Sequence, residues 1–173
     1  IIVSAQTDTV FTDVTLSKAI QHTYDSLLAE NGGGVSFYDF NQDGFDDLTF
    51  TTGKGKSLHF YQFDPLGNTF APTNLLPLNS DTFKVKVALW GDYDNDGDPD
   101  LFLAINQAPN LLFRNDKDSF LNVSVQVGLK TNRSSSFSAN WTDYNLDGHL
   151  DLFVSNNGNV VDGLIYQNEF YEA

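Results

Sequence analysis

The chain has 173 residues and a formal net charge of −14, and it contains neither cysteine nor methionine. The lack of cysteine excludes disulfides, zinc–thiolate sites and thiol catalysis, and the acidity argues against nucleic acid and anionic membranes as partners. No apolar run reaches the length of about 18 residues that a membrane-spanning helix needs, so no membrane insertion is expected.

Residues 1–31 form a lead-in to the first strong pattern. Residues 1–6 fit an ordinary first strand or, as an alternative, the tail of a signal peptide with a cleavage site after Ala5. Alternating apolar residues predict a strand over 7–15. Residues 16–31 predict a short helix or an irregular segment, which the glycines from Gly32 onward end.

Short strand patterns then follow one another to the end of the chain. In the first repeat they are predicted at 35–37, 48–51, 58–63 and from Phe70 onward. The second repeat has them at 85–90, 101–105, 111–114 and 120–127, and the third at 137–141, 152–155 and 164–167. Two full repeats and an unfinished third therefore offer about four short strands each.

One acidic stretch recurs between the first two strands of every repeat. It has the form Asp-aromatic-Asp/Asn-x-Asp-Gly-x-x-Asp and begins at Asp39, Asp92 and Asp143, in steps of 53 and 51 residues. A period of this size indicates a repeat architecture. One copy alone could be a solvated turn. Three copies in register favour a common chemistry, because a turn does not need the aspartate at position 9.

The spacing of the oxygen donors fits a hard dication. Ca²⁺ takes about 6–8 oxygen ligands, and a tight loop supplies them from alternate short acidic or amide side chains. Positions 1, 3, 5 and 9 would donate side-chain oxygens, position 7 its carbonyl, and the glycine at position 6 permits the sharp turn. About three Ca²⁺ ions are expected, on Asp39, Asn41, Asp43, Phe45, Asp47, Asp92, Asp94, Asp96, Asp98, Asp100, Asp143, Asn145, Asp147, His149 and Asp151.

The best-known calcium loop with this opening does not fit the flanking sequence. An EF-hand requires a bidentate glutamate at position 12 and helices on both sides. Position 12 here is Phe50, Leu103 or Val154, and each lies in an apolar run typical of a buried strand.

The flanks of the loops resemble a known repeat. The stretch from Ala88 to Asp94 and that from Ala139 to Asn145, with the strands at 110–115 and 164–168, are similar to FG-GAP/VCBS calcium-binding repeats. Such repeats occur in integrin α-subunit head domains and in bacterial proteins of the VCBS and ASPIC/UnbV-associated type. The resemblance covers about residues 9–170.

This resemblance implies an all-β fold made of β-propeller blades of about four antiparallel strands. Residues 1–173 would form one propeller segment, with a lead-in at 1–31 and repeats at about 32–84, 85–136 and 137–173, the last truncated. Because a closed propeller has about 4–8 blades, a partial propeller is expected, completed by further blades or by another chain. Phe37, Trp90 and Trp141, two residues before each loop, are expected to pack between blades.

The expected function is recognition and not catalysis. The three histidines are scattered and no nucleophile motif occurs, so no enzyme is predicted. The resemblance implies a secreted or cell-surface adhesion or recognition scaffold, with structural calcium and a protein or glycan ligand. Two alternatives stay open: the non-catalytic propeller part of a polysaccharide lyase or other glycan-processing enzyme, and a structural subunit of a larger assembly. Asn122, Asn132 and Asn140 are possible glycan acceptors, with Asn132 favoured.

Overall fold

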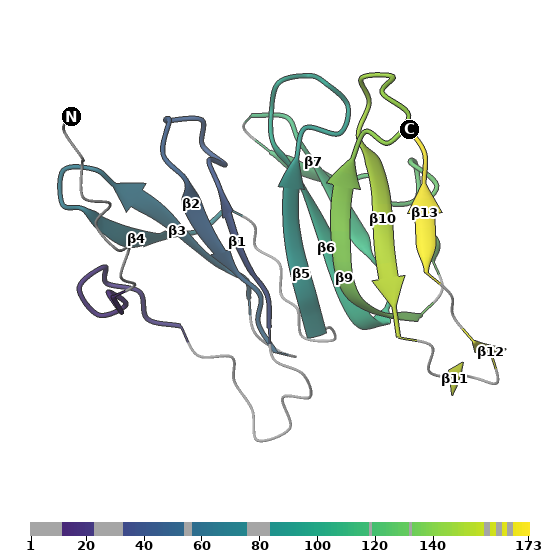
Figure 1. Cartoon of the computed structure of the whole chain (residues 1–173), viewed down its shortest axis with the longest axis horizontal. Coiled ribbons are helices and arrows are strands. Elements are labelled where there is room, and N and C mark those ends of the chain that lie inside the picture. The colour runs from purple at the N-terminus through teal and green to yellow at the C-terminus, as the bar shows by residue number, and fades with distance from the viewer. Residues whose placement is uncertain are drawn as a thin grey trace, which may run out of the picture.

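The structure is a computed structural model that describes residues 12–22, 33–53, 57–75, 84–117, 119–131, 133–157, 160–161, 164–165 and 168–173. Every regular element within these ranges is a β-strand, so the expected all-β class is confirmed (Figure 1). No helix in these ranges is long and apolar enough to cross a membrane. The favoured glycan acceptor Asn132 and the lead-in residues 1–11 and 23–31 lie outside the described ranges.

Thirteen strands follow one another in these ranges, and an acidic loop lies after the first strand of each repeat. They are β1 (Val35–Tyr38), β2 (Asp47–Phe50), β3 (His59–Asp64), β4 (Thr69–Thr73), β5 (Lys84–Gly91), β6 (Asp100–Ala108), β7 (Leu111–Asn115), β8 (Phe120–Asn122), β9 (Ser134–Thr142), β10 (Asp151–Asn156), β11 (Val160–Val161), β12 (Leu164–Ile165) and β13 (Glu169–Tyr171).

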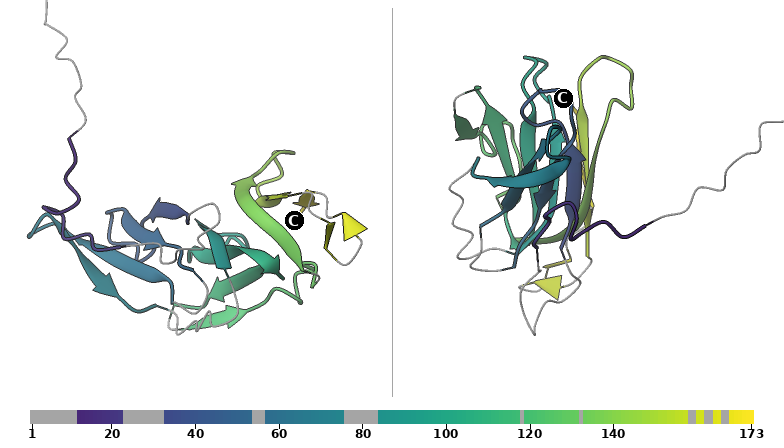
Figure 2. Two further views of the ribbon diagram at one scale, coloured as in Figure 1. Left: turned by 90° about the horizontal axis from the view of Figure 1, so that it is seen from below. Right: turned by 90° about the vertical axis from the view of Figure 1, so that its left-hand side faces the viewer.

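The strands group into three blade-like units, all with antiparallel pairing. The first blade has the order β1-β2-β3-β4, the second β5-β6-β7-β8, and the third consists of β9, β10 and β13. The far end of β6 also pairs with the start of β9, which joins the second and third blades into one sheet. The blades follow one another along the molecule in chain order (Figure 2). This is the arrangement of consecutive propeller blades, so the predicted partial propeller is confirmed.

Strand β6 lies at the centre of the core. Leu101, Leu103 and Ile105 belong to a buried cluster shared with the first blade, whereas Phe102 and Ala104 belong to one shared with the third blade. Successive side chains of a strand point to opposite faces. A strand covered on both faces therefore needs a continuous apolar run, which is the pattern found at 101–105.

Trp90 packs between the first and second blades, as predicted. Its side chain is only 4% exposed and lies against Phe40 and Phe60 of the first blade, with ring centroids 5.3 and 6.3 Å away. Its indole Nε1–H donates to Thr49 Oγ1 of β2 at 2.9 Å. A buried tryptophan normally needs such a partner for its N–H group.

Trp141 occupies the equivalent place between the second and third blades. Its ring lies 6.1 Å from Phe102, and a Cβ added to Gly91 would come within 2.7 Å of its Cδ1. Glycine at position 91 therefore lets the indole approach the backbone of β5. Phe102 replaces the threonine that Trp90 meets, so Trp141 Nε1 is buried without a hydrogen-bond partner among the described residues.

Phe37 does not pack between blades in the described structure. Its side chain is 61% exposed and lies on the face of β1 opposite to that of Tyr38, whose ring stacks on Trp90 of the second blade. The Phe37 ring meets that of Phe70 edge-on at 6.4 Å. Trp90 and Trp141 each pack against the blade that precedes them. No described blade precedes β1, so nothing of that kind covers Phe37.

The third strand of the third blade is not the predicted one. Residues 164–165 pair with β11 in a small hairpin, while β13 pairs with β10 in register Leu152 with Tyr171. This matches the pairing of Leu101 with Phe113 in the second blade. The connection from β10 to β13 is longer because it contains the β11–β12 hairpin. The aromatic residue of the third blade strand, Tyr171, therefore lies further along the chain than predicted.

Two further segments differ from prediction. Residues 12–14 are not in a strand, and 15–19 form a turn in which Lys18 N donates to Val14 O at 2.9 Å. Strand β8 ends at Asn122 instead of 127, because a turn closes after it with Leu129 N donating to Ser124 O at 2.9 Å. In both places local turn bonds replace sheet pairing.

Candidate metal centres

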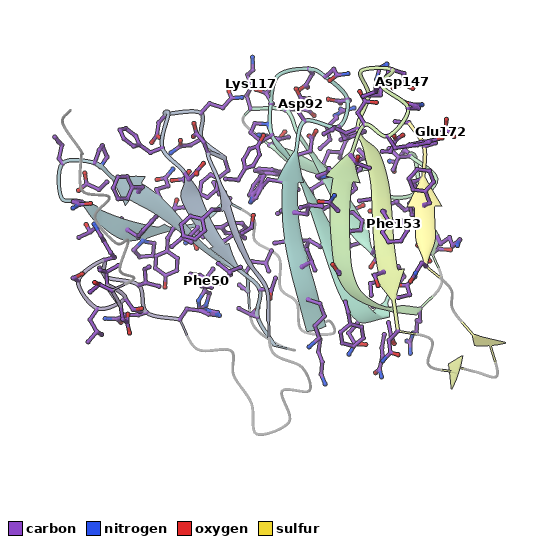
Figure 3. The ribbon with its side chains drawn as sticks, viewed as in Figure 1. Phe50, Asp92, Lys117, Asp147, Phe153 and Glu172 are labelled. Carbon is purple, nitrogen blue, oxygen red and sulfur yellow. The ribbon has the colours of Figure 1, made fainter. Side chains whose placement is uncertain are left out.

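The three acidic loops occupy the same place in each blade. Residues 39–46 join β1 to β2, residues 92–99 join β5 to β6, and residues 143–150 join β9 to β10. Asp92 and Asp147 therefore lie at the same edge of the molecule (Figure 3). Below, these are the first, second and third loops, with positions counted from Asp39, Asp92 and Asp143.

Position 1 organises each loop through its own backbone. The N–H of position 5 donates to Oδ1 of the position-1 aspartate at 3.0 Å in all three loops. The N–H of position 6 donates to Oδ2 at 2.8, 3.0 and 2.9 Å in chain order. The repeated pattern folds three sequences that differ at other positions into one shape.

Positions 4 and 6 take the left-handed backbone conformation. The φ angles of Gln42, Asn95 and Leu146 are 60°, 59° and 61°. Those of the position-6 glycines are between 90° and 94°, and a Cβ there would meet nothing within 4 Å. Backbone conformation and not lack of space therefore explains glycine at position 6.

Position 9 ties the loop to the interior of its blade. Asp47, Asp100 and Asp151 have no exposed surface. Their Oδ1 atoms accept backbone N–H groups in or next to the third strand of the blade, from Phe63, Asn115 and Ala173 at 2.9, 2.8 and 3.1 Å. In the second and third loops Oδ2 accepts the N–H of position 2 at 3.0 and 3.1 Å.

One of these buried oxygens lacks a partner. Asp47 Oδ2 in the first loop is inaccessible and makes no hydrogen bond to any described residue. The Phe40 N–H, whose counterpart Tyr93 N–H bonds Asp100, only weakly favours the Asp47 anion. An unpaired buried carboxylate oxygen is costly, and a bound cation would satisfy it.

Burial makes two of these carboxylates hard to ionise. Loss of solvation raises the pKa of Asp100 to about 7, against the lowering effect of its two backbone N–H partners. Burial raises the pKa of Asp47 to about 6, with a smaller contribution from Asp43 and Asp39. In the second loop, burial and the neighbouring Asp96 also raise the pKa of Asp94. The protein thus collects negative charge at sites where a bound cation or a proton would offset it.

The donor set fits Ca²⁺. In the second loop one carboxylate oxygen each of Asp92, Asp94 and Asp100 lies within 4.8 Å of the others. Oxygens on opposite sides of a Ca²⁺ ion at about 2.3–2.6 Å are about 5 Å apart, so one ion can contact all three. All the candidate side-chain donors are hard oxygens, the ligands that Ca²⁺ prefers.

The other predicted ligands lie beside this framework. At position 3, Asn41 and Asn145 donate to the position-5 carboxylates at 3.0 and 2.8 Å. At position 5, Asp43, Asp96 and Asp147 accept the N–H of position 7 at 2.9 Å in each loop. At position 7 the side chains diverge, since Phe45 and His149 are exposed whereas Asp98 is buried at 8% exposure.

Position 4 was not predicted to have a role, and it links neighbouring loops. Gln42 Nε2 donates to the Gly97 carbonyl of the second loop. Asn95 Nδ2 donates to the Gly148 carbonyl of the third loop at 2.8 Å. An amide at position 4 in two of three copies is the only trace of these contacts in the sequence.

The blade-like sheets and the oxygen-rich hairpin loops define a repeat protein of the β-propeller kind. A family model described as the FG-GAP-like repeat matches residues 39–103 and 92–154, which together cover more than half of the chain. The chain belongs to the FG-GAP-like repeat family. A search of curated proteins gave no match. The VCBS and ASPIC/UnbV types named from resemblance stay predictions.

Calcium affinity should rise with pH, and most strongly in the second loop. Raised carboxyl pKa values mean that the ion-free fold holds protons that the unfolded chain has lost. Its stability therefore falls as pH rises from about 4 to 7. Ca²⁺ must displace the same protons. From pH 5.5 to 7.5 the ionised fraction grows about 25-fold for a pKa near 7 but about fourfold for a pKa near 6.

The affinity of each loop can be measured by NMR during calcium titration, with the amides of Gly97 and Gly44 as reporters of the second and first loops. The protein should be freed of ions on a chelating resin, since dissolved chelators lose affinity at low pH. The first loop serves as the internal control. Equal affinities at both pH values would refute the assigned role of Asp100.

Proposed function

We propose that the chain is a secreted or cell-surface recognition module whose three loops bind Ca²⁺. The bound ions would fix the edge of the molecule that carries the loops, here called the rim, and the rim would contact a protein or glycan ligand. The observation that carries the proposal is the convergence of Asp92, Asp94 and Asp100 on one point in a loop that recurs three times. Membership of the FG-GAP-like family supports a propeller-like recognition or adhesion role. Calcium is abundant outside cells, where weak sites of this kind would be loaded.

In this proposal the metal is structural. The position-9 carboxylates of the second and third loops each hold two backbone N–H groups, one at the loop entry and one at the third strand of the blade. A bound cation would neutralise the charge of these carboxylates. It would thereby hold the acidic loop in place against the third strand of the blade. A catalytic metal would instead need an open coordination position beside an acid or base. We therefore propose a binding function without catalysis.

A cavity at the rim offers a place for the ligand. It has a volume of about 280 Å³, near the lower end of the range for small-molecule sites. Its lining includes Phe40, Gln42, Asp98, Asn115, Lys117 and Phe120. Aromatic rings with donors and acceptors around them suit either one sugar ring or one peptide side chain.

Two side chains in this cavity have polar atoms that make no hydrogen bond within the described part of the chain. Asn115 is 7% exposed, and its Oδ1 has no partner among the described residues, while its Nδ2 donates to Pro99 O at 3.1 Å. Asp98 is almost as buried, and only its backbone N–H makes a hydrogen bond within the described part of the chain. Buried acceptors of this kind favour a ligand that brings hydrogen-bond donors.

Glycan and protein arrays probed with the labelled protein would test the function. We expect binding in millimolar calcium and its loss in the ion-free protein. Lys117→Ala should weaken that binding about tenfold, because a charged hydrogen bond is lost. Lys84→Ala, at the opposite end of β5 from the second loop, is the matched control. Binding that ignores calcium would refute the proposal, and release of unsaturated sugar from a bound glycan would favour the lyase alternative.

We also propose that further blades, in the same chain or another, cover the outer faces of this segment. Val35 and Phe37 are exposed on β1, whereas Trp90 and Trp141 at the positions equivalent to Phe37 are covered. On the third blade, Phe153 and Phe170 are likewise exposed. If so, Phe37→Ser should reduce self-association measured by light scattering without lowering the unfolding temperature. Unchanged self-association would contradict this part of the proposal.

A further inference from the structure

Neighbouring loops are joined by a hydrogen bond that repeats in register. The side-chain amide at position 4 of one loop donates to the carbonyl of the position-6 glycine in the next, from Gln42 to Gly97 and from Asn95 to Gly148. Asn95 Nδ2 also lies 3.3 Å from His149 Nδ1. The third loop has Leu146 at position 4, which has no donor and is 86% exposed.

The accepting peptide group is part of the candidate metal site. The carbonyl of Gly148 and the N–H of His149 belong to one planar peptide unit. That N–H donates to Asp147 Oδ1 at 2.9 Å, and Asp147 is a position-5 candidate ligand. The second loop repeats this, with Asp98 N donating to Asp96 Oδ1 at 2.9 Å. A hydrogen bond that fixes the carbonyl of this peptide unit therefore also fixes its N–H group, and with it the position-5 carboxylate that accepts from that N–H.

The donating side chain depends in turn on the order of its own loop. Position 4 lies between the candidate ligands at positions 3 and 5 and has a positive φ angle. That conformation is unfavourable for most residues other than glycine and persists where surrounding contacts enforce it. The bonds from the Asp96 and Gly97 N–H groups back to Asp92, which span position 4 of the second loop, are such contacts. Disordering the second loop would thus withdraw the amide from the third.

We propose that Gln42 and Asn95 are positioning residues that couple the loops, so that ordering or metal binding in one loop favours metal binding in the next. The inference rests on the proposed calcium function for its metal part. Thermodynamic coupling is reciprocal, so the second and third loops raise the affinity of each other equally. One neutral hydrogen bond of this kind corresponds to a coupling of about fivefold in affinity. The series ends at Leu146.

The chain supplies a matched substitution. Leu146 has a φ angle of 61° at position 4, so this loop shape accepts leucine there. Asn95→Leu therefore places the third loop's position-4 residue in the second loop and removes the side-chain amide, and Gln42→Leu does the same in the first loop. The reverse change, Leu146→Asn, adds an amide where the described structure has no following loop and is the control.

The metal-independent test is amide hydrogen exchange in the ion-free protein. Asn95→Leu should speed exchange at the His149 N–H about fivefold, whereas Gln42→Leu should leave the His149 N–H unchanged and speed exchange at the Asp98 N–H instead. Leu146→Asn should change neither. Equal exchange rates at His149 in the wild type and Asn95→Leu would overturn the proposed coupling.

The metal-dependent test uses calcium titration with the amides of Gly97 and Gly148 as reporters. Asp96→Ala, which disables the second loop, should weaken binding in the third loop about fivefold when Asn95 is present and not in the Asn95→Leu background. If the calcium affinity of the third loop is the same with and without Asp96→Ala and Asn95→Leu, the proposed coupling is wrong and the proposed calcium function is unaffected. If no loop responds to calcium in the wild type, the calcium function fails, and the metal part of the coupling fails with it.

Discussion

Removal of calcium should lower the unfolding temperature of this protein by about 15–30 °C. An ion that binds only the folded chain contributes about 2.7 kcal/mol per site when its concentration is a hundredfold above Kd, or about 8 kcal/mol for three sites. For a chain of this size each kcal/mol shifts the midpoint by about 2–4 °C. On the proposed function the contribution is large because the buried Asp47, Asp100 and Asp151 would lose a counter-ion together. Differential scanning calorimetry with and without calcium measures the shift.

Two variants separate site chemistry from general acidity. Asp96→Ala removes a candidate ligand at position 5 of the second loop and should abolish about a third of the calcium-dependent shift, measured by the same calorimetry. Asp46→Ala removes an equal charge at position 8 of the first loop, where no ligand is expected, and should preserve the shift. A midpoint that ignores calcium in the wild-type protein would rule out three structural calcium sites.

Trp90→Ala should destabilise the protein by about 3–5 kcal/mol, the usual cost of deleting a buried tryptophan side chain. The cost is high because this side chain fills the contact between two blades. Its ring partners are Tyr38, Phe40, Phe60 and Phe120, from both blades. Chemical denaturation of the calcium-loaded protein would report the change in the free energy of unfolding.

A pair of phenylalanine substitutions isolates the hydrogen bond from the packing. Trp90→Phe removes the donor to Thr49 Oγ1, whereas Trp141→Phe removes an N–H that has no partner among the described residues. Both changes delete the same volume. We expect Trp90→Phe to cost about 1–3 kcal/mol more than Trp141→Phe, because it alone leaves a buried polar group behind. Equal costs would show that the Thr49 contact contributes nothing to stability.

Much of the fold could be predicted because the repeat supplies its own register. The acidic loop fixes where one strand ends and the next begins, so β5, β6 and β10 were located to within a few residues. The lead-in and the end of β8 were wrong, since in both places turn bonds around Val14 and Val123 compete with sheet pairing. Apolar alternation does not reveal that competition.

The third blade shows a different kind of error. Leu164 and Ile165 look like the start of a blade strand, but the strand that pairs with β10 is β13. One signal was present in the sequence. Asn168 Oδ1 accepts the Asn156 N–H at 2.9 Å, as Asn110 Oδ1 accepts the Ile105 N–H at 2.9 Å. Each asparagine precedes its blade strand by one residue, and an aromatic residue follows three positions later.

For the candidate site, the sequence indicates which residues can donate oxygen but not what holds them in place. The spacing of Asp92, Asp94 and Asp100 predicts their convergence. The backbone partners of position 9 come from a strand outside the motif, and a backbone N–H leaves no mark in a sequence. The contact from Asn95 to Gly148 joins repeats about 50 residues apart and depends on how two blades pack, which no local pattern encodes.

The register of β13 has a consequence for engineering. The connection from the second to the third blade strand spans residues 109–110 in the second blade but 157–168 in the third, yet Asp100 and Asp151 accept equivalent N–H groups in both. The edge of the sheet away from the acidic loops thus accepts connections of two residues in one blade and twelve in another without a change at the opposite edge. Foreign epitopes displayed from residues 109–110 would be carried on a scaffold whose acidic loops, at the opposite edge, stay native.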